Sequence, residues 1–319
     1  MKPVVVVYNR LYEEALEYIQ ASCDVHYFPG YKEKMPEFLE ALKGADGLIG
    51  SGLKVDEALL DQAPNLKVIA NKSVGYDNLD ISLLKKRGIR ATNTPGVLDD
   101  TVADAIVALM LAAARRVPEL DQFVKTGGWT ESGFKDHQFG VDVHHKKLGI
   151  IGMGGIGSRL AKRAHFGFDM TILYHNRSRN EQAESTYDAV YCQVEELLEQ
   201  SDFVCVMTPL TPQTKGMIGK NEFAQMKKTA IFINASRGAV VDEPALIEAL
   251  QTKQILGAGL DVFEQEPVER DNPLLSMPNV VTLPHIGSAT EETRKKMAML
   301  AAENVVAGVA GGKLKTPIF

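Results

Sequence analysis

A glycine-rich segment in the middle of the chain constrains its fold more than any other feature. Gly152, Gly154 and Gly157 form the pattern G-x-G-x-x-G, with an apolar run over 148–151 before it and helically spaced apolar residues over 156–166 after it. The first glycine permits a tight turn, the second lets a pyrophosphate approach the backbone, and the third lets helix and strand pack closely. The pattern alone is weak, because a βα turn without a ligand can contain it. In the order strand, turn, helix it predicts a dinucleotide-binding unit.

The position of this motif indicates another domain ahead of it. A dinucleotide fold usually opens with the glycine turn, yet here about 150 residues come first. Apolar runs that alternate with helical segments predict strands over 4–8, 25–28, 47–50, 66–70, 90–92, 148–151, 170–174, 203–207, 230–234, 257–260 and 280–282. This alternation predicts an α/β chain with two doubly wound parallel-sheet domains.

The segment N-T-P-G over 93–96 interrupts the alternation and marks the join between the two domains. A long apolar helix is expected over 101–116, with Thr101 as a cap near its start. The chain is expected to cross back near 287–290, before a last helix over 290–309. We therefore expect a Rossmann cofactor domain over residues 99–287, inserted into a flavodoxin-like substrate-binding domain built from residues 1–98 and 288–319.

Composition narrows the class of protein. The 319 residues are 45% hydrophobic and 24% charged, which is typical of a soluble globular protein of two domains. A formal net charge of −6 argues against a nucleic-acid partner. Cys23, Cys192 and Cys205 are too few and too far apart for a disulfide framework or a metal site, so a cytoplasmic protein is expected. The apolar run over 4–7 is too short for a signal segment, and the uncharged stretch over 105–114 is half a membrane span.

Four segments resemble the D-isomer-specific 2-hydroxyacid dehydrogenases. They are S-V-G-Y-D-N-L-D over 73–80, the glycine turn, N-A-S-R-G-A-V-V-D-E over 234–243, and G-L-D-V-F-E-Q-E-P over 259–267 followed by L-P-H-I-G-S over 283–288. Their order spans most of the chain, and jointly they are very specific. The resemblance is strongest to the branch that reduces glyoxylate, hydroxypyruvate or 2-ketogluconate. It implies hydride transfer from a nicotinamide cofactor to a small 2-oxo acid, giving a D-2-hydroxy acid.

The resemblance implies Arg237, Glu266 and His285 as catalytic residues. Reduction of a 2-oxo acid needs a proton donor and a positive group that holds the carboxylate and polarises the ketone. An imidazole exchanges protons near physiological pH and a neighbouring carboxylate favours its charged form, so His285 suits the donor and Glu266 its partner. A guanidinium binds a carboxylate bidentately, which suits Arg237. Taken singly, a histidine at position 285 is more often a satisfied loop histidine, Glu266 could be a turn residue, and Arg237 could be a surface or interdomain arginine.

The same resemblance extends to residues that would bind substrate and cofactor. Leu53, Val74 and Gly75 match its substrate side, together with Arg237 and His285; the backbone N–H groups of Val74 and Gly75 would hold the substrate carboxylate, although a plain turn is the alternative. The implied cofactor-binding residues are Thr101, Gly152, Gly154, Gly155, Ile156, Gly157, His175, Asn176, Arg177, Ser178, Thr208, Pro209, Ala235, Ser236, Asp261, Gly287 and Ser288. For Asp261 a structural role in its own turn is nearly as well supported.

The end of the strand over 170–174 indicates which nicotinamide cofactor binds. An NAD-type site places Asp or Glu there, to bind the ribose 2′-hydroxyl. Here His175 takes the position of the acid, and Arg177 and Arg179 could pair with a 2′-phosphate. We therefore expect NADPH to be preferred and NADH to be the weaker cofactor. If both arginines only face solvent, this preference has no basis.

The remaining expectations concern partners and competing functions. Trp129 and the irregular stretch over 126–145 resemble the family's dimer region, so a homodimer is expected, with a core-packing indole as the alternative. His144 and His145 are adjacent and their side chains diverge, so no metal site is expected. No membrane partner is expected either. Competing functions are an NAD-dependent 3-phosphoglycerate or D-lactate dehydrogenase, and a non-catalytic, corepressor-like protein that senses the nucleotide.

Overall fold

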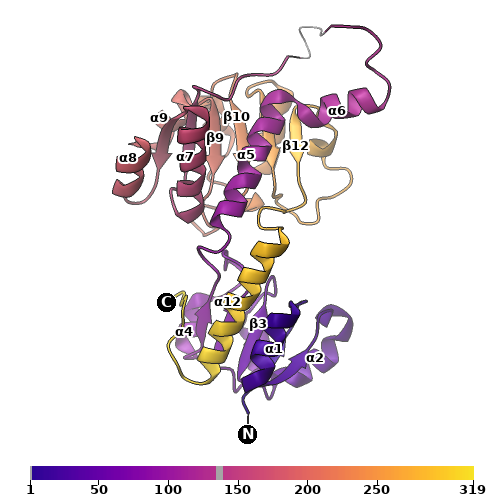
Figure 1. Ribbon diagram of the computed structural model, residues 1–319, viewed down its shortest axis with the longest axis vertical. Helices are drawn as coiled ribbons and strands as arrows, with labels where there is room; N and C mark the ends of the chain where they lie inside the picture. Colours follow the sequence, from indigo (N-terminus) through magenta and orange to yellow (C-terminus); the bar gives the residue numbers. More distant parts are fainter. Residues whose placement is uncertain (1, 134–138) are drawn as a thin grey trace. The chain divides into compact units, whose positions relative to one another are not determined.

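The computed structural model describes residues 2–133 and 139–319. The chain folds into two compact units. Unit 1 combines Met1–Leu98 with Ser288–Phe319, and unit 2 is Asp99–Gly287. Each unit contains one sheet in which all the strands are parallel, with helices on both faces (Figure 1). The predicted class, two doubly wound parallel α/β domains, is therefore confirmed.

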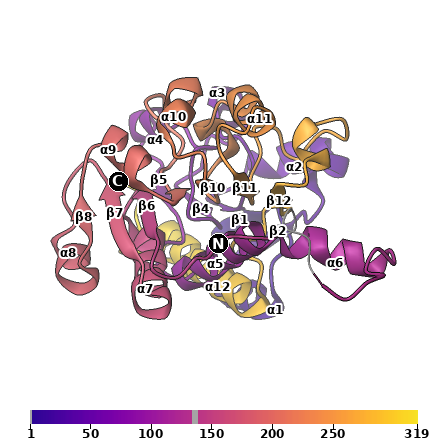
Figure 2. The same cartoon turned by 90° about the horizontal axis from the view of Figure 1, so that it is seen from above.

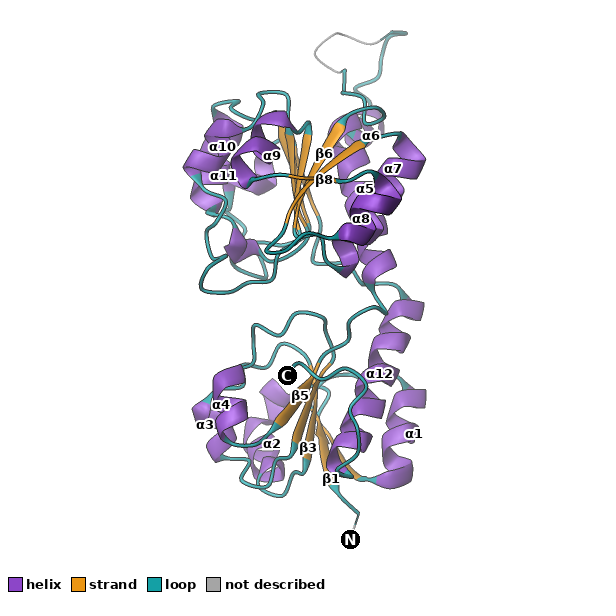
Figure 3. Ribbon diagram, turned by 90° about the vertical axis from the view of Figure 1, so that its left-hand side faces the viewer, coloured by secondary structure: helices purple, strands orange, loops and turns teal. Residues whose placement is uncertain are grey.

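Unit 1 is built on a five-stranded sheet in the order β2-β1-β3-β4-β5. Its strands are β1 (Val4–Val7), β2 (Asp24–Tyr27), β3 (Gly47–Gly50), β4 (Val68–Asn71) and β5 (Arg90–Thr92). Helices α1 (Glu13–Ser22) and α12 (Glu291–Val309) cover one face of the sheet (Figure 3). The other face carries α2 (Met35–Leu42), α3 (Glu57–Asp61) and α4 (Ile81–Lys86), with a 3-10 turn, η1 (Tyr31–Lys34), before α2. The strand order reverses between β1 and β3, as in flavodoxin-like sheets.

The long helix α12 runs against the direction of the strands beneath it. A Cβ added to Gly308, near the end of the helix, would overlap Val68 at the start of β4. Val305 and Val309 likewise contact Gly47 at the start of β3. The first turns of α12 therefore lie toward the carboxyl ends of these strands.

Unit 2 is built on a seven-stranded sheet in the order β12-β11-β10-β9-β6-β7-β8. Its strands are β6 (Lys147–Ile151), β7 (Thr171–His175), β8 (Val190–Tyr191), β9 (Phe203–Val206), β10 (Ile231–Asn234), β11 (Gly257–Leu260) and β12 (Val280–Thr282). The order reverses between β6 and β9, which is the Rossmann arrangement, with its ligand crevice at the carboxyl ends of the strands.

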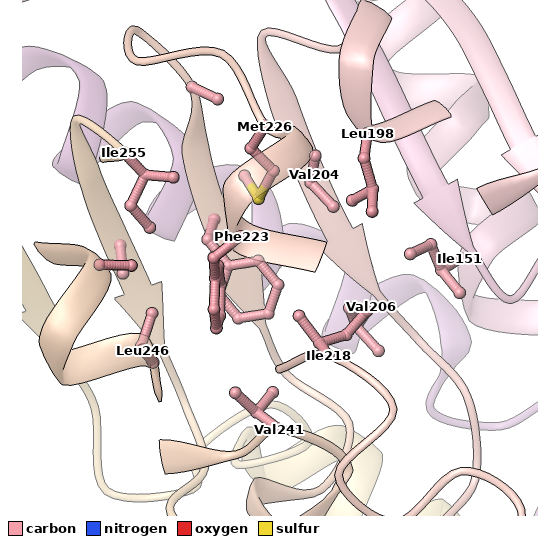
Figure 4. Packing of buried hydrophobic residues seen from close by; sticks show 14 of the residues in the cluster. Ile151, Leu198, Val204, Val206, Ile218, Phe223, Met226, Val241, Leu246 and Ile255 are labelled. Atoms are coloured by element: carbon pink, nitrogen blue, oxygen red, sulfur yellow. The ribbon is translucent and has the colours of Figure 1, made fainter. Parts of the chain in front are cut away.

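Helices cover both faces of the sheet of unit 2. On one face lie α5 (Asp99–Arg115) and α7 (Gly155–Phe168), joined by ion pairs from Arg163 to Asp100 and Asp104, and α8 (Glu181–Tyr187) packs against α7. The other face carries α9 (Val194–Gln200), α10 (Lys220–Gln225) and α11 (Glu243–Gln251) (Figure 3). The core beneath these three helices includes Phe223, Ile218 and Leu246 (Figure 4). Unit 2 also contains two 3-10 turns, η3 (Gly238–Val240) and η4 (Pro273–Ser276).

One further helix, α6 (Val117–Lys125), buries none of its residues. It projects from the rest of unit 2 in both Figure 1 and Figure 2. Trp129, just beyond it, has a side chain that is 62% exposed, so the alternative of a core-packing indole is wrong. Part of the stretch predicted to be irregular, residues 134–138, lies outside the described residues.

Several local predictions need correction. Helix α5 begins at Asp99, so Thr101 lies within its first turn and is not its cap. The short strand β8 and the short helices α3, α6, α8, α9, α10 and α11 were not predicted. A strand of two residues and helices of five to nine residues offer too few periodic positions for a secure prediction without their packing partners. No helix within the described residues is long and apolar enough to cross a membrane.

Candidate active site

The predicted site residues of unit 2 lie at one edge of its sheet. The glycine turn follows β6, Thr208 follows β9, Arg237 follows β10, Asp261 follows β11 and His285 follows β12. Because all these strands are parallel, their carboxyl ends meet at the same edge. The fold therefore brings together residues that are up to 133 positions apart, from Gly152 to His285.

The glycine turn has the geometry that a dinucleotide requires. Gly152 has a φ of +110°, and a Cβ there would lie 2.7 Å from the carbonyl carbon of Met207. A Cβ on Gly157 would overlap the carbonyl oxygen of Gly152, so α7 packs directly on the turn. A Cβ on Gly154 would meet nothing within 4 Å. The open backbone at Gly154 and the N-terminus of α7 therefore fit a pyrophosphate group. Gly155 and Ile156 form the first turn of that helix.

His175 is held at the end of β7 by two contacts. Its ring stacks on Tyr191, with centroids 5.8 Å apart and an interplanar angle of 30°. Its Nδ1 lies 3.0 Å from the carbonyl oxygen of Cys192. Since a carbonyl oxygen only accepts, Nδ1 is the nitrogen that donates, and Nε2 is the ring nitrogen that remains for other interactions.

The two arginines after His175 differ in their surroundings. Arg179 donates from Nε and Nη2 to the carboxylate of Glu184, at 2.9 and 2.7 Å. Glu184 also accepts a hydrogen bond from the Tyr174 hydroxyl at 2.6 Å, and its pKa is lowered, chiefly by the hydrogen bond from Arg179. Arg177 is exposed and has no ion pair within the described residues. Of the two cations considered for a 2′-phosphate, Arg177 is the one that is not already paired. Asn176 is half-buried and Ser178 is exposed beside it.

Asn180 links this loop to the glycine turn. Its Oδ1 accepts from the backbone N–H of Ala183 and caps α8, while its Nδ2 donates to the carbonyl of Met153 at 3.0 Å. Its own N–H donates to the Tyr174 hydroxyl at 2.7 Å. The sequence reasoning missed this residue. An Asn directly before an acidic helical segment is a recognisable capping signal, but its bond to Met153 is not readable from sequence.

Glu266 and His285 form the central pair of the site. Nδ1 of His285 lies 2.7 Å from Oε2 of Glu266, while Oε1 of Glu266 accepts from the backbone N–H of Phe263 at 3.2 Å. Burial opposes ionisation of Glu266, but the hydrogen bond to His285 and the charges of His285 and Arg237 outweigh it. The pKa of Glu266 is therefore lowered. With Nδ1 bound to a carboxylate, Nε2 of His285 is the atom that can transfer a proton.

Asp261 shapes the turn that carries His285. The side chain of Asp261 is buried, and its two oxygens accept from the backbone N–H groups of Ile286 and Gly287 at 2.7 and 2.8 Å. His285 has a φ of +54°, a left-handed conformation that costs a non-glycine residue about 1–2 kcal/mol. Burial, the largest influence, raises the pKa of Asp261 despite the two amide hydrogen bonds. In this structure both carboxylate oxygens are engaged by the backbone.

Arg237 is presented by a turn that Asn234 organises. Oδ1 of Asn234 accepts from the N–H and hydroxyl of Ser236, and its Nδ2 donates to the carbonyl of Arg237 at 3.0 Å. The guanidinium is half-buried and donates to the carbonyl of Ser236 at 2.8 Å. Gly238 leaves no room for a Cβ against the backbone of Phe263, so the turns after β10 and β11 are in contact. This contact brings Arg237 near Glu266.

The other residues predicted to bind cofactor are placed as follows. After β9, Thr208 is half-buried and Pro209 is exposed. The carbonyl of Pro209 accepts a hydrogen bond from the hydroxyl of Thr214 at 2.6 Å. After β10, Ala235 is half-buried. Ser236 is engaged by Asn234, as described above. Gly287 is buried, and a Cβ added there would lie 3.1 Å from Oδ2 of Asp261. Ser288 is the first residue of the second segment of unit 1.

The predicted substrate residues of unit 1 lie at the carboxyl edge of its own sheet. Leu53 follows β3, and Val74 and Gly75 follow β4. Asn93 binds the carbonyl of Val74 at 2.8 Å, and Asn71 binds the carbonyl of Gly75 at 2.7 Å. The backbone N–H groups of Val74 and Gly75 have no acceptor among the described residues. This loop therefore presents two amide donors on a fixed backbone.

His144 and His145 precede β6 and were considered above as possible metal ligands. Within residues 2–133 and 139–319, no cluster of three or more His, Cys, Asp or Glu side chains could hold a metal ion. His144 lies 3.8 Å from Asp142. Its ring packs edge-on against that of His145, with centroids 5.0 Å apart, so the expectation that these two side chains diverge is wrong.

Comparison with known proteins identifies the family. Residues 107–287 match the family described as D-isomer specific 2-hydroxyacid dehydrogenase, NAD binding domain. The chain is 50% identical over 312 residues to glyoxylate/hydroxypyruvate reductase B of Salmonella heidelberg, covering 98% of this chain and 96% of that protein. It is 51% identical to the protein of that name from Yersinia pestis, covering 98% and 95%.

One solved structure of the same fold was crystallised with a cofactor. The NADPH-dependent glyoxylate/hydroxypyruvate reductase of Sinorhizobium meliloti, crystallised with NADP and malonate, is 32% identical to this chain. It superimposes with a TM-score of 0.89, covering 100% of this chain and 97% of that one. The chain therefore belongs to the D-isomer specific 2-hydroxyacid dehydrogenases, a family of NAD(P)-dependent oxidoreductases that act on a CH–OH group.

Proposed function

We propose that the protein is an NADPH-preferring reductase of small 2-oxo acids, with glyoxylate and hydroxypyruvate as substrates and 2-ketogluconate as a further candidate. The product is a D-2-hydroxy acid where a stereocentre forms. The observation that carries the proposal is the Glu266–His285 pair, 2.7 Å apart, at the same sheet edge as an open glycine turn. The names of the Salmonella, Yersinia and Sinorhizobium relatives support the choice of substrates.

His285 is the proposed proton donor. Its Nε2 gives a proton to the carbonyl oxygen of the substrate, while Glu266 holds Nδ1 and stabilises the charged imidazole before transfer. Arg237 binds the substrate carboxylate and polarises the ketone. In unit 1, the N–H groups of Val74 and Gly75 are the proposed donors to a carboxylate of the substrate. The bound nicotinamide supplies the hydride.

Unit 2 is the proposed cofactor domain and unit 1 the proposed substrate domain. The glycine turn and the start of α7 hold the pyrophosphate, and Thr208, Pro209, Ala235 and Ser236 line the remaining strand ends. Arg177 is the cation for the 2′-phosphate, with His175 beside it in place of an acid. Arg179 contributes indirectly, through its bidentate pair with Glu184.

The protein is proposed to act as a homodimer in the cytoplasm. Val117 and Val124 of α6 are 53% and 51% exposed, and Trp129 and Phe139 are exposed beyond them. A second copy of this chain is the proposed cover for this apolar surface. Light scattering tests this: a dimer is expected, and the double variant Val117→Glu/Val124→Glu should be monomeric. The three cysteines are free thiols, which suits a reducing compartment.

A substrate panel tests the activity. Each 2-oxo acid is mixed with NADPH or NADH, and the loss of reduced-nicotinamide absorbance is followed. Glyoxylate and hydroxypyruvate with NADPH should give the highest kcat/KM, and His285→Gln should abolish turnover while NADPH still binds. Preferred reduction of phosphohydroxypyruvate or pyruvate with NADH would favour the phosphoglycerate or lactate dehydrogenase alternative. Nucleotide binding without any turnover would favour the corepressor-like alternative.

A further inference from the structure

Lys72 lies at the sheet edge of unit 1, where none of the proposed steps uses it. It directly follows β4, and its backbone N–H donates to the carbonyl of Gly50, at the end of β3, at 2.6 Å. Its Nζ donates to the carbonyl of Arg10, beyond the end of β1, at 2.7 Å. Since β3 lies between β1 and β4 in the sheet, the side chain crosses the end of β3. The ammonium group therefore lies at the point where the strand order reverses, which is where such sheets bind ligands.

A second cation lies close to Lys72. Arg294 is in the first turns of α12, which lie toward the carboxyl ends of β3 and β4 because the helix runs against the strands. Burial, and then the positive charge of Arg294, lower the pKa of Lys72 to about 8. The ammonium therefore remains mostly charged at neutral pH in a partly buried position, where an uncompensated charge is unfavourable.

Among the described residues, no acidic side chain pairs with Lys72 or Arg294. In the part of the chain that the structure describes, neither Lys72 nor Arg294 has a carboxylate oxygen within 4.0 Å. The next residue of the helix, Lys295, shows the contrast. It is paired with Glu291 at 2.9 Å and with Glu14 at 3.9 Å. An anion placed between Lys72 and Arg294 would gain from two charges that the protein itself leaves unneutralised.

We propose that Lys72 and Arg294 form a subsite for a second anionic group on the substrate, a carboxylate or phosphate, beside the loop of Val74 and Gly75. The inference rests on the proposed function, in which that loop binds the first carboxylate. The subsite extends the substrate range from glyoxylate and hydroxypyruvate to 2-oxo acids that carry an anion at the far end. A lysine and an arginine together recognise either group through charge-assisted hydrogen bonds.

Paired substrates isolate the effect of the second charge. Oxaloacetate is compared with 2-oxobutyrate, and phosphohydroxypyruvate with hydroxypyruvate, as ratios of kcat/KM for the NADPH-loaded enzyme. For each pair, the ratio is kcat/KM of the substrate with two anionic groups divided by that of the substrate with one. Lys72→Met should lower this ratio about tenfold for at least one pair, because a tenfold change corresponds to the loss of one ion pair of about 1.4 kcal/mol. Lys72→Arg should restore most of it. The first pair identifies a carboxylate subsite and the second a phosphate subsite.

Calorimetry provides a readout that does not depend on turnover. Malonate should bind the wild-type NADP complex more tightly than acetate, and Lys72→Met should remove that difference. Lys295→Met is the matched control, because it removes a lysine that is already paired and lies one residue from Arg294. In this control the two kcat/KM ratios and the malonate affinity should stay at wild-type values. If Lys72→Met does not fold, Arg294→Met replaces it.

The outcomes separate the two proposals. Unchanged ratios and unchanged malonate affinity in Lys72→Met would overturn the subsite. An equal loss for charged and uncharged substrates, without rescue by Lys72→Arg, would also overturn it and would make Lys72 a support for the loop. Absence of glyoxylate and hydroxypyruvate reduction by the wild type would instead refute the proposed function, while the malonate measurement would still test the subsite.

Discussion

Asp261→Asn tests whether a buried carboxylate sets the position of the proton donor. Asp261 accepts from the N–H groups of Ile286 and Gly287 at 2.7 and 2.8 Å, directly after His285 with its φ of +54°. Asparagine keeps one acceptor oxygen but presents an NH₂ group to the other backbone N–H. One of the two buried donors therefore loses its partner.

The size of the effect follows from these contacts. A hydrogen bond to a charged acceptor contributes about 1.5–3 kcal/mol, and a buried donor without an acceptor costs about 1–3 kcal/mol. Removing a buried charge, whose burial raises the pKa of Asp261, offsets part of this loss. We expect Asp261→Asn to lower the free energy of unfolding by about 2 kcal/mol. Without both hydrogen bonds from Asp261, His285 can leave its left-handed conformation. A loss of about 2 kcal/mol of transition-state stabilisation would lower kcat/KM about thirtyfold.

The assay combines urea unfolding with glyoxylate kinetics. Asp242→Asn is the matched control, because Asp242 caps α11 by accepting from the N–H of Ala245 and asparagine caps a helix equally well. The control should stay within about 0.5 kcal/mol of the wild type in stability, with unchanged kcat/KM. Equal values for the two variants would refute the reasoning. A loss of stability alone, with full activity, would show that the turn does not position His285.

Three further perturbations probe the cofactor site and the catalytic pair. Arg177→Asp should raise the Kd for NADPH far more than that for NADH, as measured by fluorescence titration; equal losses, or none, would contradict the assignment of Arg177. Gly152→Ala should cost about 2–4 kcal/mol in a thermal or urea unfolding experiment, because a Cβ there meets the Met207 backbone at a φ of +110°; stability equal to the wild type would show that the turn can relax. Glu266 has a lowered pKa, so its contribution to stability is present above the ordinary carboxyl pKa of about 4.3 and is lost as the pH falls through its folded value. The unfolding free energy of Glu266→Gln should therefore depend less on pH below about 5 than that of the wild type, and identical slopes would exclude this linkage.

The strands and the main helices could be predicted because their signals are local. The runs over 148–151 in β6 and 231–233 in β10 are apolar without a break, since parallel strands are buried on both faces. The glycine turn could also be predicted from a local signal, because the three glycines that its geometry requires lie within six consecutive positions. The short helices such as α8 and α10 could not, since they are stable only through packing on the sheet.

The sequence by itself determined the alternation of strands and helices and the place of the glycine turn. Through the resemblance of its motifs it also named Arg237, Glu266 and His285 as the candidates for catalysis. Only the tertiary structure decided which side chains pair. In the folded protein Arg179 pairs with Glu184. Both oxygens of Asp261 accept hydrogen bonds from the turn after His285, and the ammonium of Lys72 donates to the carbonyl of Arg10. The physical reason is that a motif lies within a few consecutive residues. A side chain's partner, in contrast, is fixed by strand order and register, which join residues far apart in the chain.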